Sequence, residues 1–325
     1  MMLRKLWPSM TKIKKRTALL ILMVALIATV GGYFGVQYDL DSKIQFAIND
    51  TLSDGAGQKA TVILLGGQSN ASGCSSDQYL QQNVSEEKYS EYQNGYDNVY
   101  INYLSGMNMS QGFVKCGTRQ GEMEGCFGPE LGLAEKLHET YPDELFFIIK
   151  CAWGGTNLYE QWLSPSSIGK TGELYKKFVV FVETSLEYLV SKNYDIQIVG
   201  MCWMQGESDS FSTKTATKYS TNLSNLVKDI RKKFSQYAAA DGIAFVDAYI
   251  AANPAYWVYY ESVNQGKKEF AQSSPMNVVV DTIAQGLSCS REPAETPDLA
   301  HYDSLSEIKL GHLFAEQLIN FLMKE

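Results

Sequence analysis

Two short polar motifs could supply the nucleophile, base and orienting acid that acyl transfer requires. Ser69 stands in the sequence GGQSN, and His301 follows Asp298 by three residues in DLAH. In a turn, this spacing lets a carboxylate hold one imidazole nitrogen, so that the other accepts the serine proton. Each motif alone also fits an ordinary polar turn. Together they predict Ser69 as nucleophile, His301 as base and Asp298 as orienting acid.

Two further motifs could stabilise the negative charge that develops on the attacked carbonyl oxygen. They are AWGGTN, which contains Gly155, and MQGESD, which contains Gln205. The backbone N–H groups of Ser69 and Gly155 and the Gln205 side-chain amide would give three donors to an oxyanion. Glu207 is a second candidate for the orienting acid. The candidate substrate contacts are Gln68, Asn70, Gly154, Thr156 and Glu207.

The remaining histidines and the cysteines are less informative. His138 falls at the end of a predicted helix and His312 inside the last one, and none of the six cysteines forms a Cys-x-x-Cys pair. A structural zinc site therefore has little support, and the sequence predicts no metal and no cofactor. Cys116 and Cys126, in a Gly-rich segment, are the most plausible disulfide. Cys151 and Cys202 lie in apolar runs, where a buried thiol and a bridge fit equally well.

Short apolar runs rich in β-branched and aromatic residues predict the strands that position these motifs. They are Thr61–Leu65, Val99–Leu104, Leu145–Cys151, Ile196–Trp203, Ile243–Val246 and Val278–Val280. Helical patterns lie between them, so we expect an α/β fold with a doubly wound, mostly parallel sheet flanked by helices. Three motifs come directly after strands. Because parallel sheets bind ligands beyond the carboxyl ends of their strands, these motifs should converge.

Three helices have clear sequence signals. Pro129 suits the first turn of a helix that ends before Tyr141. A stripe of apolar residues from Tyr219 to Phe234 at spacings of three and four predicts a second. Ser304, followed three residues later by Glu307, predicts a capping box at the start of the last helix.

The N-terminus differs in composition from the rest of the chain. Six of the 28 basic residues and none of the 36 acidic residues precede Asp39, and an uncharged apolar run spans Ala18–Val36. We expect residues 1–38 to form a membrane anchor, 39–58 a linker and 59–325 the globular domain. A cleaved signal peptide is the alternative. Basic residues stay on the cytoplasmic side, so either case places residues 39–325 outside the cytoplasm, at the cell membrane or secreted.

The body that remains is acidic. With the six N-terminal basic residues set aside, residues 39–325 carry a formal charge of −14, from 22 basic and 36 acidic residues. Nucleic-acid affinity depends on lysine and arginine neutralising phosphates, so nucleic acid is not an expected partner. Residues 74–125, rich in Tyr, Asn and Gly, are expected to form an excursion from the sheet.

Five motifs in order resemble the SGNH-type hydrolases. GQSNASG, FGPELGLAEKL, AWGGTNL, WMQGESD and DLAHYDS look most like the sialate O-acetylesterase and acetylxylan esterase branch of carbohydrate esterases. The resemblance implies a flavodoxin-like three-layer fold, an acyl-enzyme mechanism without a cofactor, and an acetylated carbohydrate as substrate. It also implies the catalytic and oxyanion roles given above, with Gln205 where the wider group commonly has asparagine.

Two other classes of protein remain open. Tyrosines in the excursion, such as Tyr79, Tyr89 and Tyr92, would suit a membrane-tethered, non-catalytic glycan-binding module, although they also suit ordinary packing. A lipase or thioesterase of the same fold would need an apolar acyl channel. The segment after Ser69 is instead polar, with Gln78, Gln81 and Glu86, which favours a short acyl group on a sugar.

Overall fold

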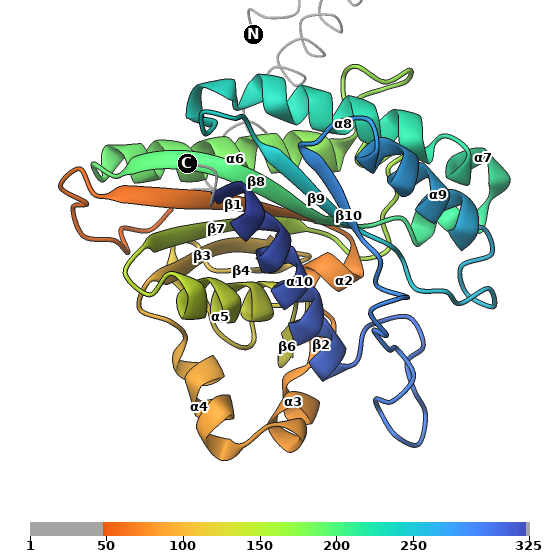
Figure 1. Cartoon of the computed structure of the whole chain (residues 1–325), viewed down its shortest axis with the longest axis horizontal. Coiled ribbons are helices and arrows are strands. Elements are labelled where there is room, and N and C mark those ends of the chain that lie inside the picture. Colours follow the sequence, from red (N-terminus) through yellow and green to blue (C-terminus); the bar gives the residue numbers. More distant parts are fainter. Residues whose placement is uncertain (1–47, 323–325) are drawn as a thin grey trace, which may run out of the picture. The chain divides into compact units, whose positions relative to one another are not determined.

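The computed structural model describes residues 48–322, and a mostly parallel sheet runs through their centre (Figure 1). The order across the sheet is β10-β9-β8-β1-β7-β3-β4, and β5 also pairs with β3. The strands are β1 Lys59–Gly67, β3 Val99–Ser105, β4 Asn108–Met109, β5 Val114–Lys115, β7 Leu145–Ala152, β8 Asp195–Met204, β9 Ala244–Ala248 and β10 Asn277–Val280. Within this sheet, only β4 and β5 run antiparallel to their neighbour. This arrangement confirms the predicted sheet.

Each predicted strand is present, and most extend slightly beyond their apolar run. β1 lies between β7 and β8 and is buried on both faces, which explains its unbroken apolar sequence. It continues through Gly66 and Gly67, which pair with Cys151 and Ala152 of β7. Both glycines of the GGQSN motif therefore belong to the end of the strand itself.

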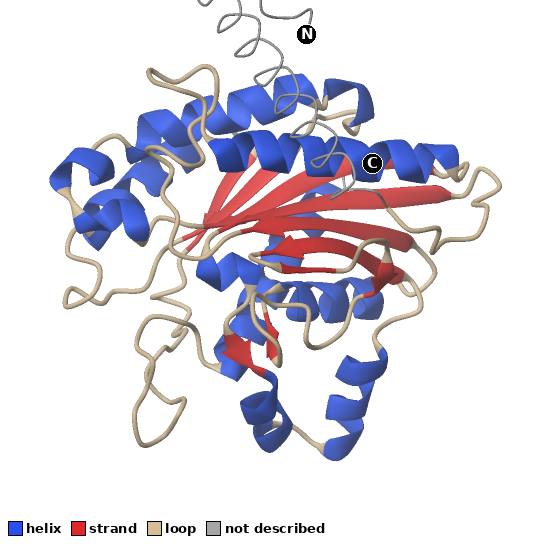
Figure 2. Cartoon of the chain, turned by 180° about the vertical axis from the view of Figure 1, so that it is seen from behind, coloured by secondary structure: helices blue, strands red, loops and turns tan. Residues whose placement is uncertain are grey.

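Helices cover both faces of the sheet (Figure 2). On one face lie α6 (Glu173–Ser191), α8 (Tyr219–Lys233) and α9 (Tyr260–Ala271), and on the other lie α5 (Glu130–Thr140) and α10 (Ser304–Leu322). In α8 the predicted apolar stripe, including Leu223, Leu226 and Ile230, is buried. Shorter helices are α2 Ser69–Ser72, α3 Asp77–Asn83, α4 Glu86–Asn94, α7 Thr213–Ala216 and the 3₁₀ turns η1 Ser208–Phe211 and η2 Ser235–Tyr237.

Two glycines let α5 and α10 approach closely. A Cβ on Gly132 would lie 2.0 Å from the carbonyl oxygen of Ile308, and one on Gly311 would lie 2.2 Å from that of Pro129. Atoms cannot come this close, so the helix crossing requires glycine at both positions. The contact fixes α10, whose first residue follows the loop that carries His301.

The predicted capping box of α10 is wrong. The Ser304 hydroxyl donates to Glu292 Oε1 at 2.7 Å, and both carboxylate oxygens of Glu307 are buried without a hydrogen-bond partner among the described residues. Glu307 turns into the protein rather than back to the helix start. Burial there raises the pKa of Glu307 well above its usual range, which favours the neutral acid.

The expected Cys116–Cys126 disulfide is also wrong. All six cysteines are free thiols in the structure. The Cys116 thiol is buried and contacts the carbonyl oxygen of Glu130 at 3.4 Å, whereas Cys126 lies in β6 (Cys126–Phe127), which pairs with β2 (Ser75–Ser76). The two residues therefore belong to different local structures. Cys151 and Cys202 are buried thiols in β7 and β8.

The expected anchor, Ala18–Val36, lies outside the described residues. Between residues 48 and 322, no helix is both long and apolar enough to span a membrane. The described part of the expected linker packs on the domain: the backbone N–H groups of Thr51 and Leu52 donate to the Tyr188 hydroxyl at 3.0 and 3.1 Å, and Gly55 lies against the Tyr194 ring.

Candidate active site

The ends of β1, β7 and β8 bring three of the motifs side by side. In the sheet register, Gly67 pairs with Ala152 on one side and Met204 on the other. The chain is tight here, because Gly67 has a φ of +142° and a Cβ on it would lie 2.0 Å from the Met204 carbonyl oxygen. The predicted convergence at the carboxyl edge of the sheet is therefore present.

Ser69 is the first residue of α2, directly after this turn. Its side chain is half-buried, and its hydroxyl makes no hydrogen bond to any residue between 48 and 322. Its backbone N–H is equally unpaired within the same range, as expected at the first turn of a helix. Both groups are available to a ligand.

Asn70 ties the Ser69 turn to the histidine loop. Its Oδ1 accepts from the Tyr302 N–H at 3.0 Å, and its Nδ2 donates to the Ala300 carbonyl at 3.3 Å. These are the two neighbours of His301. Asn70 therefore positions His301 close to Ser69, although they are 232 residues apart in the chain. Because Asn70 is only 2 % exposed, its role is to build the site rather than to contact substrate.

His301 and Asp298 form a close pair. His301 Nδ1 lies 2.8 Å from Asp298 Oδ2, while the other carboxylate oxygen accepts from the Ala300 N–H at 3.1 Å. Leu299, between them, has a φ of +63°, in the left-handed region that non-glycine residues rarely adopt. A proton on Nδ1 shared with Asp298 leaves Nε2 free to accept a proton.

Glu207 holds a different partner. Its Oε1 accepts from Asn70 Nδ2 at 2.9 Å, and its Oε2 has no partner among the described residues. The carboxyl is 1 % exposed, and burial raises its pKa. Glu207 therefore hydrogen-bonds Asn70, which positions the histidine loop, whereas Asp298 contacts the imidazole of His301.

Gly155 provides a second free N–H. It has a φ of +68°, its N–H has no partner between residues 48 and 322, and no atom lies within 4 Å of where a Cβ would be. The space above it is open. With Ser69, it gives two unpaired backbone donors after adjacent strands, the arrangement that an oxyanion requires.

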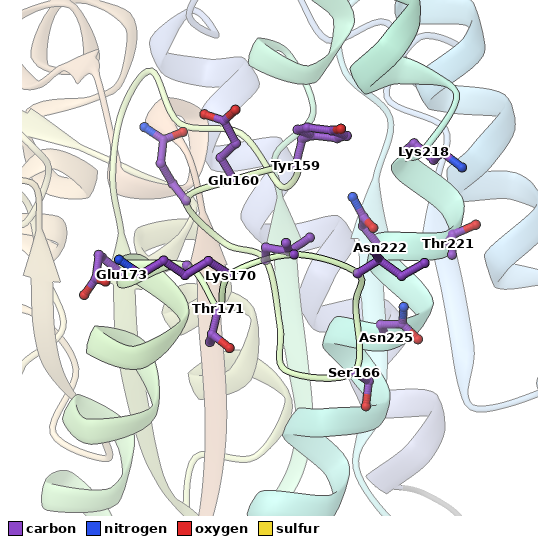
Figure 3. A pocket seen from close by; sticks show the side chains of 15 residues that line it. Tyr159, Glu160, Ser166, Lys170, Thr171, Glu173, Lys218, Thr221, Asn222 and Asn225 are labelled. Carbon is purple, nitrogen blue, oxygen red and sulfur yellow. The ribbon is translucent and has the colours of Figure 1, made fainter.

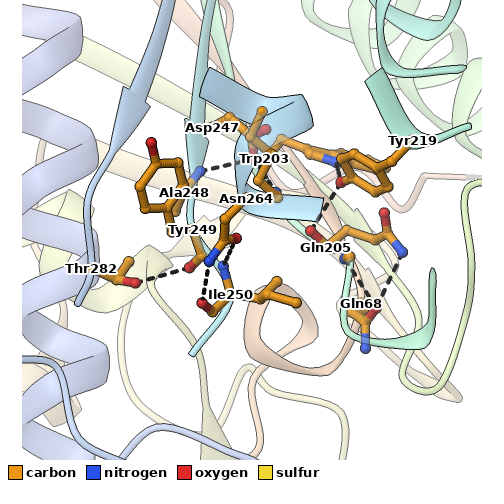
Figure 4. Close-up of polar contacts among 12 residues, drawn as sticks. Gln68, Trp203, Gln205, Tyr219, Asp247, Ala248, Tyr249, Ile250, Asn264 and Thr282 are labelled. Atoms are coloured by element: carbon orange, nitrogen blue, oxygen red, sulfur yellow. Dashed lines mark hydrogen bonds and ion pairs between the residues drawn. The ribbon is translucent and has the colours of Figure 1, made fainter. Parts of the chain in front are cut away.

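Gln205, the expected third oxyanion donor, has its side-chain amide bonded within the protein. It is fully buried, and its Nε2 donates to Asp209 Oδ2 at 2.6 Å and to the Thr156 carbonyl at 3.0 Å. Gln68 Oε1 accepts from Gln205 and from the N–H groups of Gly206 and Ser208, each at 3.2 Å (Figure 4). The side-chain amides of Gln68 and Gln205 thus connect the ends of β1 and β8 with the loop after β7. Burial raises the pKa of Asp209 to about 6.

Thr156 is also structural. Its hydroxyl donates to the Trp153 carbonyl at 2.6 Å and accepts from the Trp162 indole at 2.9 Å, and it is 5 % exposed. Gly154 donates its N–H to Glu122 Oε1 at 3.3 Å. Of the five expected substrate contacts, four are thus buried side chains that hold the site together, and Gly154 faces a protein carboxylate.

Glu122 is the functional candidate that sequence reasoning missed. Besides Gly154, its carboxylate accepts from the Ser72 hydroxyl of α2, and its own N–H donates to Gly73 at 2.8 Å. It therefore joins the turn that carries Ser69 to the loop that carries Gly155. The acid lies in a Gly-rich stretch, GTRQGEMEG, which is the one signal that could have drawn attention to it.

The other histidines lie elsewhere. His138 Nδ1 contacts Asn98 Oδ1 at 2.6 Å, and His312 Nε2 contacts Glu135 Oε2 at 2.7 Å. In residues 48–322, no group of three or more His, Cys, Asp or Glu side chains is arranged to hold a metal ion.

A pocket of about 740 Å³ lies between the loop before α6 and the start of α8. Figure 3 shows Tyr159, Asn222 and Asn225 around it. Neither Ser69 nor His301 lines this pocket, so it is separate from the chemistry described above.

Comparisons with solved structures agree with the fold. A protein of Arabidopsis thaliana is 19 % identical with a TM-score of 0.57, and the match covers 80 % of this chain and 98 % of that one. NanS is 15 % identical with a TM-score of 0.58, over 85 % and 100 % of the two chains. A carbohydrate acetylesterase of Xanthomonas citri is 15 % identical with a TM-score of 0.55, over 81 % and 56 %. At these identities the likeness establishes the fold alone.

Comparison of sequences identifies the family. No protein with a curated description matches the chain. The family model described as carbohydrate esterase, sialic acid-specific acetylesterase matches residues 59–320, which is most of the chain and includes every motif discussed above. The chain therefore belongs to the sialic acid-specific acetylesterase family of carbohydrate esterases, as the resemblance of its motifs predicted.

Proposed function

We propose that this protein is a serine esterase that removes O-acetyl groups from carbohydrate through an acyl-enzyme. The observation that carries the proposal is the His301–Asp298 pair, linked by Asn70 to the turn that presents the unpaired Ser69 hydroxyl. Family membership supports the carbohydrate ester as substrate. The acetylated carbohydrate is a polysaccharide or a sialic acid.

The mechanism follows from these groups. Ser69 Oγ attacks the acetyl carbonyl carbon while His301 Nε2 takes the hydroxyl proton, and Asp298 stabilises the imidazolium through Nδ1. The Ser69 and Gly155 N–H groups donate to the oxyanion. As the carbon–oxygen bond to the sugar breaks, His301 returns the proton to the sugar oxygen. Water then attacks the acetyl-serine by the same steps, which releases acetate and restores the serine.

The test is acetate release by the purified full-length chain from acetylated sugars and from p-nitrophenyl esters of increasing acyl length. A carbohydrate acetylesterase should work best on acetyl, because the segment after Ser69 is polar and each methylene left outside a pocket forgoes about 0.8 kcal/mol of burial. Rates that rise with acyl length would instead assign the protein to the lipase or thioesterase class.

Ser69→Ala identifies the nucleophile. Loss of a triad nucleophile lowers kcat by about 10⁴- to 10⁶-fold, and removal of one half-buried oxygen that makes no hydrogen bond within residues 48–322 should leave stability nearly unchanged. The matched control is Ser235→Ala, an exposed serine in η2 at the opposite edge of the sheet. A Ser69→Ala enzyme with more than about a tenth of the parent rate would contradict the assignment.

We also propose that the Ala18–Val36 run tethers the esterase to the membrane, with the catalytic domain on the extracytoplasmic side. Its 19 uncharged residues, preceded by six basic ones, support this location.

A further inference from the structure

A group of exposed aromatic side chains lies at the same edge of the sheet as Ser69. Phe211 is 58 %, Tyr256 43 % and Tyr259 38 % exposed. Trp257 lies beneath them, with its ring centroid 5.6 Å from Phe211 and 5.9 Å from Tyr256. We call these four residues the aromatic surface. Exposed aromatic side chains grouped on one surface usually mark a binding site, because leaving them in water is unfavourable.

The aromatic surface is continuous with the candidate active site. Phe211 ends η1, which begins directly after Glu207, so the 3₁₀ rise of about 2 Å per residue places it roughly 8 Å further along. The Tyr259 N–H donates to the Ser210 carbonyl at 2.9 Å. The segment that carries Tyr256 and Tyr259 also contacts the histidine loop, because Asn253 Nδ2 donates to the carbonyl oxygen of Leu299 at 3.1 Å. In Figure 1, η1 and the loop before α9 lie near α7 and α9, beyond the arrowheads of the strands.

The chemistry of the surface favours a sugar chain over a membrane. Aromatic faces pack against the C–H faces of sugar rings, while the tyrosine hydroxyls stay in water and can bond sugar hydroxyls. Neither of the two contributing segments, 207–213 and 253–261, contains a lysine or arginine, and the exposed charged side chain in them is the acidic Glu261. Attraction to anionic lipids would require basic residues there.

We propose that the aromatic surface is a subsite for the sugar chain that carries the acetyl ester. The substrate is then an acetylated oligosaccharide or polysaccharide rather than a free monosaccharide. This inference rests on the proposed esterase function, which it extends by naming the form of the substrate.

The experiment compares full-length Phe211→Ala and Tyr256→Ala with the parent on two kinds of substrate. For acetylated xylo-oligosaccharides from disaccharide to hexasaccharide, and for O-acetylated sialyl oligosaccharides, kcat/KM of the parent should rise with chain length. Each substitution should lower kcat/KM on the longest chains of the accepted series by about 3- to 10-fold, mainly through KM. On p-nitrophenyl acetate, which is too small to reach the surface, the variants should match the parent, which also shows that they fold.

Two control variants locate the effect. Tyr237→Ala removes an aromatic side chain from η2 at the opposite edge of the sheet and should change nothing. Ile168→Ala alters a fully exposed side chain that lines the 740 Å³ pocket. A loss on long chains with Ile168→Ala, and none with the aromatic variants, would assign the sugar chain to that pocket and overturn the proposal.

Failure of this inference and failure of the esterase proposal give different results. Hydrolysis of p-nitrophenyl acetate with unchanged oligosaccharide kinetics in both aromatic variants would refute the subsite and leave the esterase intact. If the parent hydrolyses no ester, calorimetric binding of xylohexaose that Phe211→Ala weakens would still support the subsite. A parent dimer that Phe211→Ala dissociates would instead assign the surface to a second copy of the chain.

Discussion

The two candidate acids of the site hold different partners. Asp298 contacts His301 Nδ1 directly, whereas Glu207 contacts Asn70, which holds the backbone on both sides of His301. Asp298 can fix the imidazole tautomer and stabilise the imidazolium charge, whereas Glu207 can only position the histidine loop. The two acids therefore differ in whether they contact the imidazole directly.

We expect Asp298→Asn to lower kcat far more than Glu207→Gln. An asparagine at the orienting position favours the wrong imidazole tautomer, and this costs about 10⁴-fold in a serine triad. Glu207→Gln retains an oxygen that can accept from Asn70, so its loss should be about tenfold or less, as for one hydrogen bond. Steady-state kinetics on p-nitrophenyl acetate measure both. A larger loss for Glu207→Gln would make Glu207 the orienting acid.

Glu122 connects the two segments that carry Ser69 and Gly155, whose relative position matters for the proposed acyl transfer. Its two carboxylate oxygens accept from Ser72, three residues after the proposed nucleophile Ser69, and from Gly154, next to the proposed oxyanion donor Gly155. A Cβ at position 154 would lie 2.5 Å from Glu122 Oε2, so a side chain there would displace the carboxylate. We therefore regard Glu122 as a positioning residue.

Glu122→Gln should lower kcat by about 10- to 100-fold with little change in KM, because a hydrogen bond to a charged group contributes about 1.5–3 kcal/mol. The amide has one acceptor oxygen where the carboxylate has two, so either Ser72 or Gly154 loses its partner. Glu124→Gln is the matched control, since Glu124 is exposed in the same loop. A change confined to KM would place Glu122 in substrate binding instead.

At the scale of elements, the crossing of α5 and α10 determines where the histidine loop ends, because α10 begins directly after it. Gly132→Ala would place a methyl group 2.0 Å from the Ile308 carbonyl, so the helices must separate. We expect a loss of about 1–3 kcal/mol in the free energy of unfolding, measured by urea denaturation, together with reduced activity as α10 moves. Gly266→Ala in α9 is the control, because its nearest new contact is 3.3 Å away. Equal stability in the two variants would contradict this packing argument.

The elements were predictable from the sequence because their signals are local. Apolar runs such as the one around Val62 predict strands, and apolar stripes such as the one around Leu223 predict helices. Both patterns can be recognised from neighbouring residues in the sequence alone. Side-chain partners were not predictable in the same way. The Gln205 amide bonds Asp209, and Cys116 lies against Glu130, because the tertiary fold and local turns set these contacts. The unpaired N–H of Gly155 was anticipated from its motif, although a glycine pair after a strand also fits an ordinary turn.

At the scale of the whole molecule, the parallel sheet explains how residues from 69 to 301 meet. β1 lies between β8 and β7 and runs parallel to both. The carboxyl ends of these strands therefore lie at the same edge of the sheet. We propose that the N-terminal segment sets the location of this domain. The Ala18–Val36 run, at about 1.5 Å per residue in a helix, nearly matches a bilayer core of roughly 30 Å.

We therefore expect the activity to stay with the membrane fraction at high salt, and an impermeant acetylated substrate to reach it in intact cells. Salt screens ionic attachment but not a buried apolar helix. Leu26→Lys places a charge near the centre of the run, which costs about 2.5–3.5 kcal/mol for insertion, so the membrane-bound fraction should fall. Leu26→Ile keeps the run apolar and should behave as the parent. If the parent activity is released entirely into the medium, the run is cleaved as a signal peptide and the esterase is secreted.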